Sequence, residues 1–308
     1  MKASSLPLFR WRLAQLASHL VVALIALVVV GGATRVMEAG LACPDWPLCY
    51  GTFLPGRQMN VQVFLEWFHR LDAFLVGIAL LVQFVVALIY RSKLPRWLLF
   101  GYGTLLFLVS LQGALGALTV LRLLPSLIVT AHLALALTLI SLMSALSQRL
   151  LEVNHSPSPF WWRLMGASSL LMVIFQCLLG GRMATTWSSY RCLIQDQSCH
   201  LLDLHRFFAI LSTFLIVAFV FASLVLGGWT RKQWPFLVSV LTLVAIQIAL
   251  GVSSVHLDLS QPVMIVSHQL VAALLVAFLS SLVVKRPKCS EEIVLQTVEE
   301  SLMEVCHG

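Results

Sequence analysis

The chain has 308 residues, of which 59% are hydrophobic and only 11% are charged, and its formal net charge is +7. Soluble domains carry about 25% charged residues, so this composition excludes an ordinary soluble domain and indicates an all-α integral membrane protein. The positive charge does not indicate a nucleic-acid partner, because the basic residues are scattered between apolar runs and form no patch with interleaved aromatic residues.

Eight apolar segments are long enough to cross a bilayer, since a spanning helix needs about 20 residues. In chain order, we expect these spans at residues 13–33, 66–90, 97–121, 126–148, 161–181, 203–228, 235–255 and 263–284. The first is interpreted as a retained anchor, because it has the length of a span and lacks the small-residue cleavage site of a signal peptide. With the N-terminus in the cytoplasm, thirteen Lys and Arg residues lie in inner segments and five in outer loops. This bias predicts that both termini are cytoplasmic.

Four histidines form two pairs with the same spacing of 63 residues, His69 with His132 and His205 with His268. Each lies near the outer start of a predicted span. Histidine within a bilayer is costly and indicates a function. Two imidazoles on neighbouring helices can ligate a haem iron from both sides, so the spacing predicts one haem-binding pair in each half of the chain.

Other features repeat at an offset of about 136 residues. The segment QGALGALTV, which begins at Gln112, matches QIALGVSSV, which begins at Gln247. Chance likeness between apolar segments would explain matched leucines but not matched histidines, glutamines and cysteine loops. We therefore predict two tandem pseudo-symmetric four-helix bundles, at residues 1–150 and 151–285, followed by a cytoplasmic tail at 286–308. Repeats of four helices keep the same orientation, so the axis relating them lies near the membrane normal.

Each half carries two cysteines in its first outer loop, Cys43 and Cys49 in one half and Cys192 and Cys199 in the other. These loops face an oxidising compartment, where disulfides persist, so we predict the disulfides Cys43–Cys49 and Cys192–Cys199. The first is also a candidate for redox activity, because a short exposed bridge can be labile. A zinc site is less favoured, since the C-x-x-C spacing is absent.

The two halves differ beside the first histidine. Glu66 lies three residues before His69 and therefore on the same helical face, whereas the second half has Leu202 at this position. A carboxylate beside a haem suits proton transfer or the stabilisation of positive charge. Alternatively, Glu66 is favoured simply because it lies near a helix N-terminus. Arg70 and Arg206, which follow the histidines, either pair with haem propionates or extend to the membrane interface.

The loop GLACPDWPLCYG at residues 40–51, the motif EWFHR at residues 66–70, the four helix-borne histidines and the duplicated layout together closely resemble the haem A synthase family. The resemblance covers the chain up to about residue 285. It implies an oxidoreductase that converts haem O to haem A, by oxidising a ring methyl to a formyl group, for the assembly of terminal oxidases such as cytochrome oxidase.

The resemblance also implies roles for individual residues. His205 and His268 would be the axial ligands of a resident haem b cofactor. The substrate haem would bind at His69 and His132, and Glu66 would be the catalytic carboxylate. Arg70, if it meets a propionate, would belong to the substrate haem site as well.

Partners and location follow from the same resemblance. We expect the protein in the cell inner (plasma) membrane, in contact with lipid and haem O, and with a haem O synthase and an electron-transfer protein as further candidate partners. The main alternative is a b-type membrane electron carrier with two permanent bis-histidine haems, which uses the same histidines but does not need Glu66. A haem transporter is a third class.

Overall fold

The computed structural model describes residues 5–152, 156–195 and 198–287, and in this part of the chain the regular structure is helical. Eight of the described helices are long and apolar enough to cross a membrane, which confirms the fold class that the sequence predicts. They are α1 (Ser5–Val36), α2 (Val61–Ile89), α3 (Arg96–Leu121), α4 (Ser126–Leu151), α5 (Phe160–Thr185), α7 (His200–Val225), α9 (Trp234–His256) and α10 (Pro262–Val284). Two short helices, α6 (Ser188–Gln195) and α8 (Gly228–Arg231), lie in connections.

The largest difference from the predicted limits is at α1, which begins at Ser5 and not at residue 13. The other limits agree to within about five residues, and α2 begins at Val61 and not at residue 66. Asn60 causes the earlier start, because its side chain accepts a hydrogen bond of 3.0 Å from the backbone N–H of Val63 and caps the helix. Proline at positions 95, 125 and 159 immediately precedes α3, α4 and α5, where its missing N–H removes no helical hydrogen bond.

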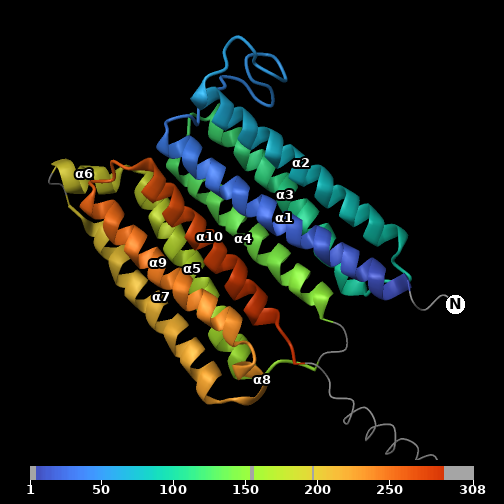
Figure 1. The fold of residues 1–308 in the computed structure, drawn as a ribbon. Coiled ribbons are helices and arrows are strands. Elements are labelled where there is room, and N and C mark those ends of the chain that lie inside the picture. Colours follow the sequence, from blue (N-terminus) through green and yellow to red (C-terminus); the bar gives the residue numbers. More distant parts are fainter. Residues whose placement is uncertain (1–4, 153–155, 196–197, 288–308) are drawn as a thin grey trace, which may run out of the picture.

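The helices pack in two groups of four (Figure 1). In the first group the contacts run from α1 to α2, α3, α4 and back to α1, and in the second from α5 to α7, α9, α10 and back to α5. The groups meet where α10 packs on α1 and α4 and where α4 packs on α5. Every contact in the first group therefore has a counterpart in the second, and the main buried core contains residues of both groups. Most of the predicted tail, residues 288–308, lies outside the described residues.

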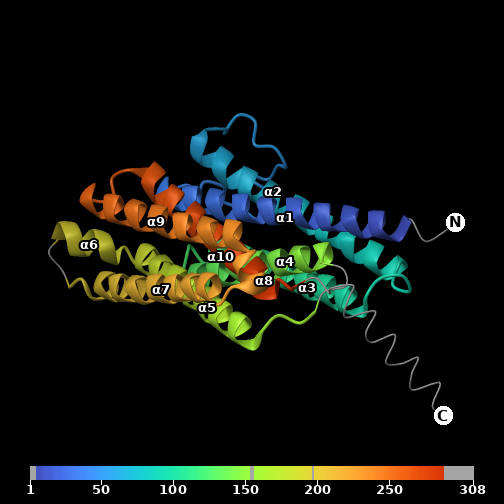
Figure 2. The ribbon, with the colours of Figure 1, turned by 60° about the horizontal axis from the view of Figure 1, so that its bottom comes forward.

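The connections gather at the two ends of the bundle. The loop between α1 and α2 and the short helix α6 lie at one end, and α8 lies at the other with the start of α1 (Figure 1). In the second view, the loop between α1 and α2 projects clear of the helices (Figure 2). The tight turns from α3 to α4 and from α9 to α10 also share a conformation, since Leu123 and Leu124, like Asp258 and Leu259, have positive φ angles.

Adjacent glycines on α1 and α5 allow the two groups to approach closely. Gly32 of α1 faces Gln269 of α10, whose amide donates a hydrogen bond of 2.9 Å to the carbonyl of Val28. A Cβ on Gly32 would lie 1.9 Å from the amide oxygen of Gln269. At the corresponding place, Gly181 of α5 faces Leu133 of α4. Small residues commonly permit such close packing between membrane helices, and here one of the two contacts is polar while the other is apolar.

Candidate functional site

Each of the four predicted histidines packs against a glycine on the preceding spanning helix. The pairs are His69 with Gly31, His132 with Gly116, His205 with Gly180 and His268 with Gly251. The Cε1 atom of each imidazole lies 3.1 to 3.4 Å from the position that a Cβ on the glycine would occupy. An alanine at Gly31, Gly180 or Gly251 would crowd the ring, and one at Gly116 would only just contact it, so these glycines leave the space in which the imidazoles lie.

Within each predicted pair the imidazoles are close enough to interact electrostatically, His69 with His132 and His205 with His268. Their role as haem ligands stays a prediction. The Nδ1 atoms of His69, His132 and His268 are buried and have no hydrogen-bond partner among the described residues. Buried polar atoms are nearly always satisfied, so these nitrogens point to a ligand.

This donor set fits haem better than a bare metal ion. The described residues contain no group of three or more His, Cys, Asp or Glu side chains that could hold a metal ion. A haem iron needs only two protein ligands, because its porphyrin supplies the other four. Two paired imidazoles in an apolar bundle match that requirement.

Glutamines contact the histidines of the second half, a feature that the sequence argument missed. The side-chain nitrogen of Gln176 lies 3.1 Å from Nδ1 of His205 and donates a hydrogen bond of 2.7 Å to the backbone carbonyl of His205. The side-chain nitrogen of Gln247 lies 3.1 Å from Nε2 of His268. Gln176 precedes Gly180 by four residues, which is one helical turn, whereas the corresponding residue before Gly31 is Leu27. A glutamine one turn before the glycine that faces a histidine was therefore a sequence pattern that could have predicted this contact.

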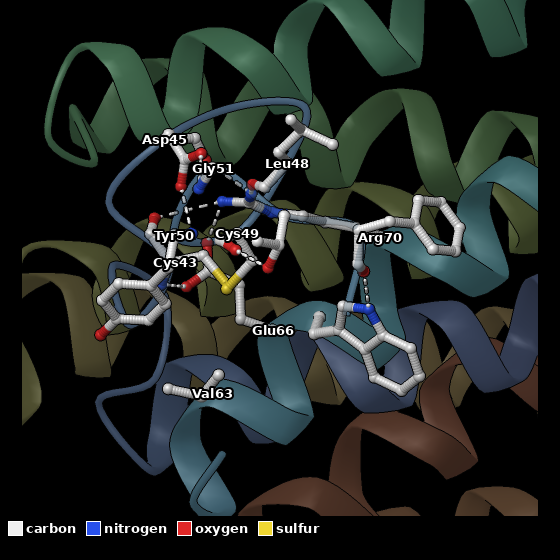
Figure 3. Close-up of a disulfide and its surroundings, with 12 residues drawn as sticks. Cys43, Asp45, Leu48, Cys49, Tyr50, Gly51, Val63, Glu66 and Arg70 are labelled. Carbon is white, nitrogen blue, oxygen red and sulfur yellow. Dashed lines mark hydrogen bonds and ion pairs between the residues drawn. A yellow bond between two sulfur atoms is a disulfide. The ribbon is translucent and has the colours of Figure 1, made fainter. Parts of the chain in front are cut away.

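Glu66 is buried, with only 5% of its surface exposed, and its carboxylate is directed at the loop between α1 and α2 (Figure 3). One oxygen accepts a hydrogen bond of 2.8 Å from the backbone N–H of Cys43, and the other accepts one of 2.6 Å from the guanidinium of Arg70. Glu66 shares a helical face with His69, but its two carboxylate oxygens are bonded to other groups. One is held by the disulfide loop, at Cys43, and the other by Arg70, which itself contacts that loop.

Arg70 has partners that differ from the predicted haem propionate. One terminal nitrogen donates to the carbonyls of Asp45 and Leu48, and the other donates to the carbonyl of Cys43 and to Glu66. A guanidinium has four terminal N–H groups and one further N–H at Nε. All four terminal groups are directed at acceptors in the protein, and the pairing of Arg70 with a propionate stays a prediction.

The loop that Arg70 contacts is itself highly ordered by local bonds. Cys43 and Cys49 form a disulfide with a Cα–Cα distance of 4.8 Å and are 0% and 1% exposed. The carboxylate of Asp45 accepts hydrogen bonds from the backbone N–H groups of Gly51 and Tyr50, and these bonds, that from Gly51 foremost, lower the pKa of Asp45.

The second half lacks this arrangement. Cys192 and Cys199 form the second predicted disulfide, with a Cα–Cα distance of 5.0 Å. Arg206, the counterpart of Arg70, forms an ion pair of 3.6 Å with Asp203, and the two side chains are 55% and 67% exposed. Leu202 is buried in place of Glu66. Only the first half therefore has a buried carboxylate at this position.

Comparison with known proteins identifies the family. The model of the cytochrome oxidase assembly protein family (COX15-CtaA) matches residues 14–280, which include all four histidines, Glu66 and both disulfides. The chain belongs to this family.

Several members have been named as enzymes. A protein of Shewanella oneidensis named Heme A synthase is 30% identical over 190 residues, which are 54% of this chain and 55% of that protein. The Heme A synthase of Bradyrhizobium diazoefficiens is 31% identical over 215 residues, 54% of this chain and 58% of its own. That of Caulobacter sp. strain K31 is 32% identical over 199 residues, 52% of this chain and 56% of its own. The chain thus spans a little over half the length of the relatives that it matches.

Proposed function

We propose that the chain is a haem A synthase, which oxidises a ring methyl of haem O to a formyl group and so supplies haem A to terminal oxidases. Membership of the cytochrome oxidase assembly protein family and the names of its relatives support this activity. The observation that carries it is the asymmetry between two otherwise matched halves, because a buried carboxylate, Glu66, stands three residues before His69 and buried Leu202 stands three residues before His205.

In this proposal the two histidine pairs have different tasks. His69 and His132 bind the iron of the substrate haem, and His205 and His268 hold a resident haem b. When bound there, haem b would supply one-electron redox chemistry. The glycines opposite the histidines keep each imidazole close against its neighbouring helix, which fixes the direction of the ring.

Glu66 has the chemistry that the reaction needs. The methyl group would be oxidised first to an alcohol and then to a geminal diol, which loses water to give the formyl group. Written with water as the oxygen source, the sum is –CH3 + H2O → –CHO + 4 H+ + 4 e−, and the electrons would leave two at a time to the proposed electron-transfer partner. Each oxidation withdraws electrons from the ring substituent, so positive charge builds up on the substrate porphyrin. A carboxylate fixed nearby in a region of low dielectric stabilises that charge more strongly than water would and can accept a proton.

The proposed location is the cell inner membrane, with both termini in the cytoplasm. The distribution of Lys and Arg supports this orientation. It places the disulfide loops on the outer, oxidising side and the proposed haem sites in the outer half of the membrane. Haem O would enter from lipid, and a haem O synthase and an electron-transfer protein are the proposed partners.

The proposal is tested by expressing the full chain together with a source of haem O, and by identifying the extracted pigments by mass. We expect haem A and haem b from the unaltered protein. Glu66→Gln, which has the same shape but no charge, should retain haem b and bound haem O and yield almost no haem A. Asp203 follows Leu202, the counterpart of Glu66 in the second half. Asp203→Asn is therefore the matched control and should still produce haem A.

The haems extracted from the purified protein also distinguish a haem A synthase from the main alternative, a b-type electron carrier. A b-type electron carrier, which the equivalence of the two histidine pairs would also suit, holds two tightly bound b haems and changes neither of them. Two stoichiometric b haems with haem O left unconverted would reject the synthase. Normal haem A production by Glu66→Gln would remove Glu66 from the catalytic role.

A further inference from the structure

The disulfide loop and the start of α2 form one closed unit centred on Cys43. The backbone N–H of Cys43 donates to Glu66, its carbonyl accepts a hydrogen bond of 3.3 Å from Arg70, and its sulfur is joined to Cys49. Arg70 also bonds Glu66, so the ring of contacts closes on itself (Figure 3). Each member of this ring holds at least two others in place.

The strength of this unit comes from the geometry of arginine. Its planar fork can direct several N–H groups at fixed acceptors at once, which a lysine ammonium cannot do. The fork lies between one carboxylate and the carbonyls of three loop residues, Cys43, Asp45 and Leu48. The side chain of Arg70 is only 14% exposed, so these bonds are partly shielded from competing water, and bonds to a charged group are the stronger class.

A second contact joins the same two segments. The indole N–H of Trp67 donates a hydrogen bond of 2.7 Å to the carbonyl of Phe53, in the later part of the loop. The loop is thus bonded to Glu66, Trp67 and Arg70 of α2, which flank His69 in the sequence. No equivalent bonds join Arg206 to a loop among the described residues, where its ion-pair partner is Asp203 on its own helix.

We propose that Arg70 is a positioning residue that fixes the disulfide loop on α2 and thereby holds the Glu66 carboxylate in its working orientation. The part that concerns the loop stands on the contacts above, and the part that concerns catalysis rests on the proposed function. Without the guanidinium, Glu66 loses the partner of one oxygen, and the loop loses a shared donor for three of its carbonyls. The carboxylate is then free to rotate and the loop to lift.

The loop part is tested without haem O, by measuring how fast each disulfide of the purified full-length protein is reduced. The reductant is a water-soluble phosphine, and the new thiols are trapped with a maleimide and counted by mass spectrometry. Since Cys43 and Cys49 are 0% and 1% exposed, their reduction requires the loop to open. Arg70→Gln should accelerate reduction of Cys43–Cys49 by at least about tenfold, because opening becomes easier when charged hydrogen bonds are lost.

Matched controls make this result specific. Arg206→Gln alters the corresponding residue of the second half and should leave the reduction rate of Cys43–Cys49 unchanged. Cys192–Cys199 should react at its normal rate in every variant, which reports that the fold is retained. Arg70→Lys keeps the charge and most of the side-chain volume and should show a smaller acceleration of the same bridge. Unchanged reduction of Cys43–Cys49 in both Arg70 variants overturns the proposal.

The catalytic part needs haem O and a different readout. Arg70→Gln should bind haem O with nearly normal affinity while the turnover to haem A falls, since only the orientation of Glu66 is disturbed. A loss of haem O affinity with a protected disulfide would overturn the positioning role and assign Arg70 to a propionate instead. If the unaltered protein makes no haem A, the proposed function fails, and the loop measurement still decides whether Arg70 fixes the loop.

Discussion

The contact between Gly180 and His205 gives the most direct test of the histidine environment. A Cβ at Gly180 would lie 3.2 Å from Cε1 of His205, closer than ordinary van der Waals contact between carbons. In Gly180→Ala, the imidazole must therefore move by a few tenths of an ångström from its present position. We expect the haem b that we propose for this pair to bind more weakly.

The size of the effect follows from the cost of crowding a packed site. Overpacking by one carbon typically costs about 1–3 kcal/mol, and about 1.4 kcal/mol corresponds to a factor of ten in affinity. Haem b affinity should therefore fall by about 5- to 150-fold. Alanine also favours a helix over glycine by about 1 kcal/mol, but this gain is the same with and without haem and cancels in the binding equilibrium.

The assay is the transfer of haem b from the purified protein to an excess of a haem-free acceptor, followed by absorbance. Gly116→Ala should show a smaller effect on the first pair, since its Cβ would lie 3.4 Å from His132. Gly113→Ala is the control, because a Cβ there would meet nothing within 4 Å among the described residues. If Gly180→Ala retains haem b as well as Gly113→Ala does, the glycine does not define the place of the imidazole.

Three further predictions concern other parts of the structure. His205→Ala should abolish the bis-histidine absorbance of haem b, whereas His69→Ala should retain it and lose only haem A production, as seen in spectra and extracted pigments. Gln269→Leu, which removes the hydrogen bond to Val28, should lower the free energy of unfolding by about 0.5–1.5 kcal/mol in denaturant titrations. In a double-mutant cycle, Gly32→Ala should be less harmful in that background, because it no longer meets the amide. The pKa of Asp45 is lowered in the folded protein, so its carboxylate stabilises the loop fully at pH values above 3.8, its usual pKa. This stabilisation is lost as the pH falls through the pKa of the folded protein, and reduction of Cys43–Cys49 should accelerate in that range. Asp45→Asn should remove the pH dependence.

The sequence alone determined the class of protein, and it predicts how the histidines pair. Bilayer thickness fixes the length of an apolar helix, so eight spans could be predicted from hydrophobic runs, and the observed helices follow them. The equal spacing of His69 and His132 with His205 and His268 predicts two pairs, and the members of each pair lie within electrostatic range of each other. Both features are local or repeated patterns, which sequence expresses directly.

The partners of Arg70 and Glu66 were decided by the tertiary structure. Helical periodicity places Glu66 on the face of His69, but it does not say where the preceding loop folds back. That loop bonds one carboxylate oxygen of Glu66 and offers three carbonyls to Arg70, while the other oxygen and the remaining terminal N–H group of Arg70 bond each other. The contacts of Gly32 with Gln269 and of Gly180 with His205 likewise join different helices. Such contacts depend on how helices pack across long distances in the chain, and no periodicity within one segment encodes that geometry.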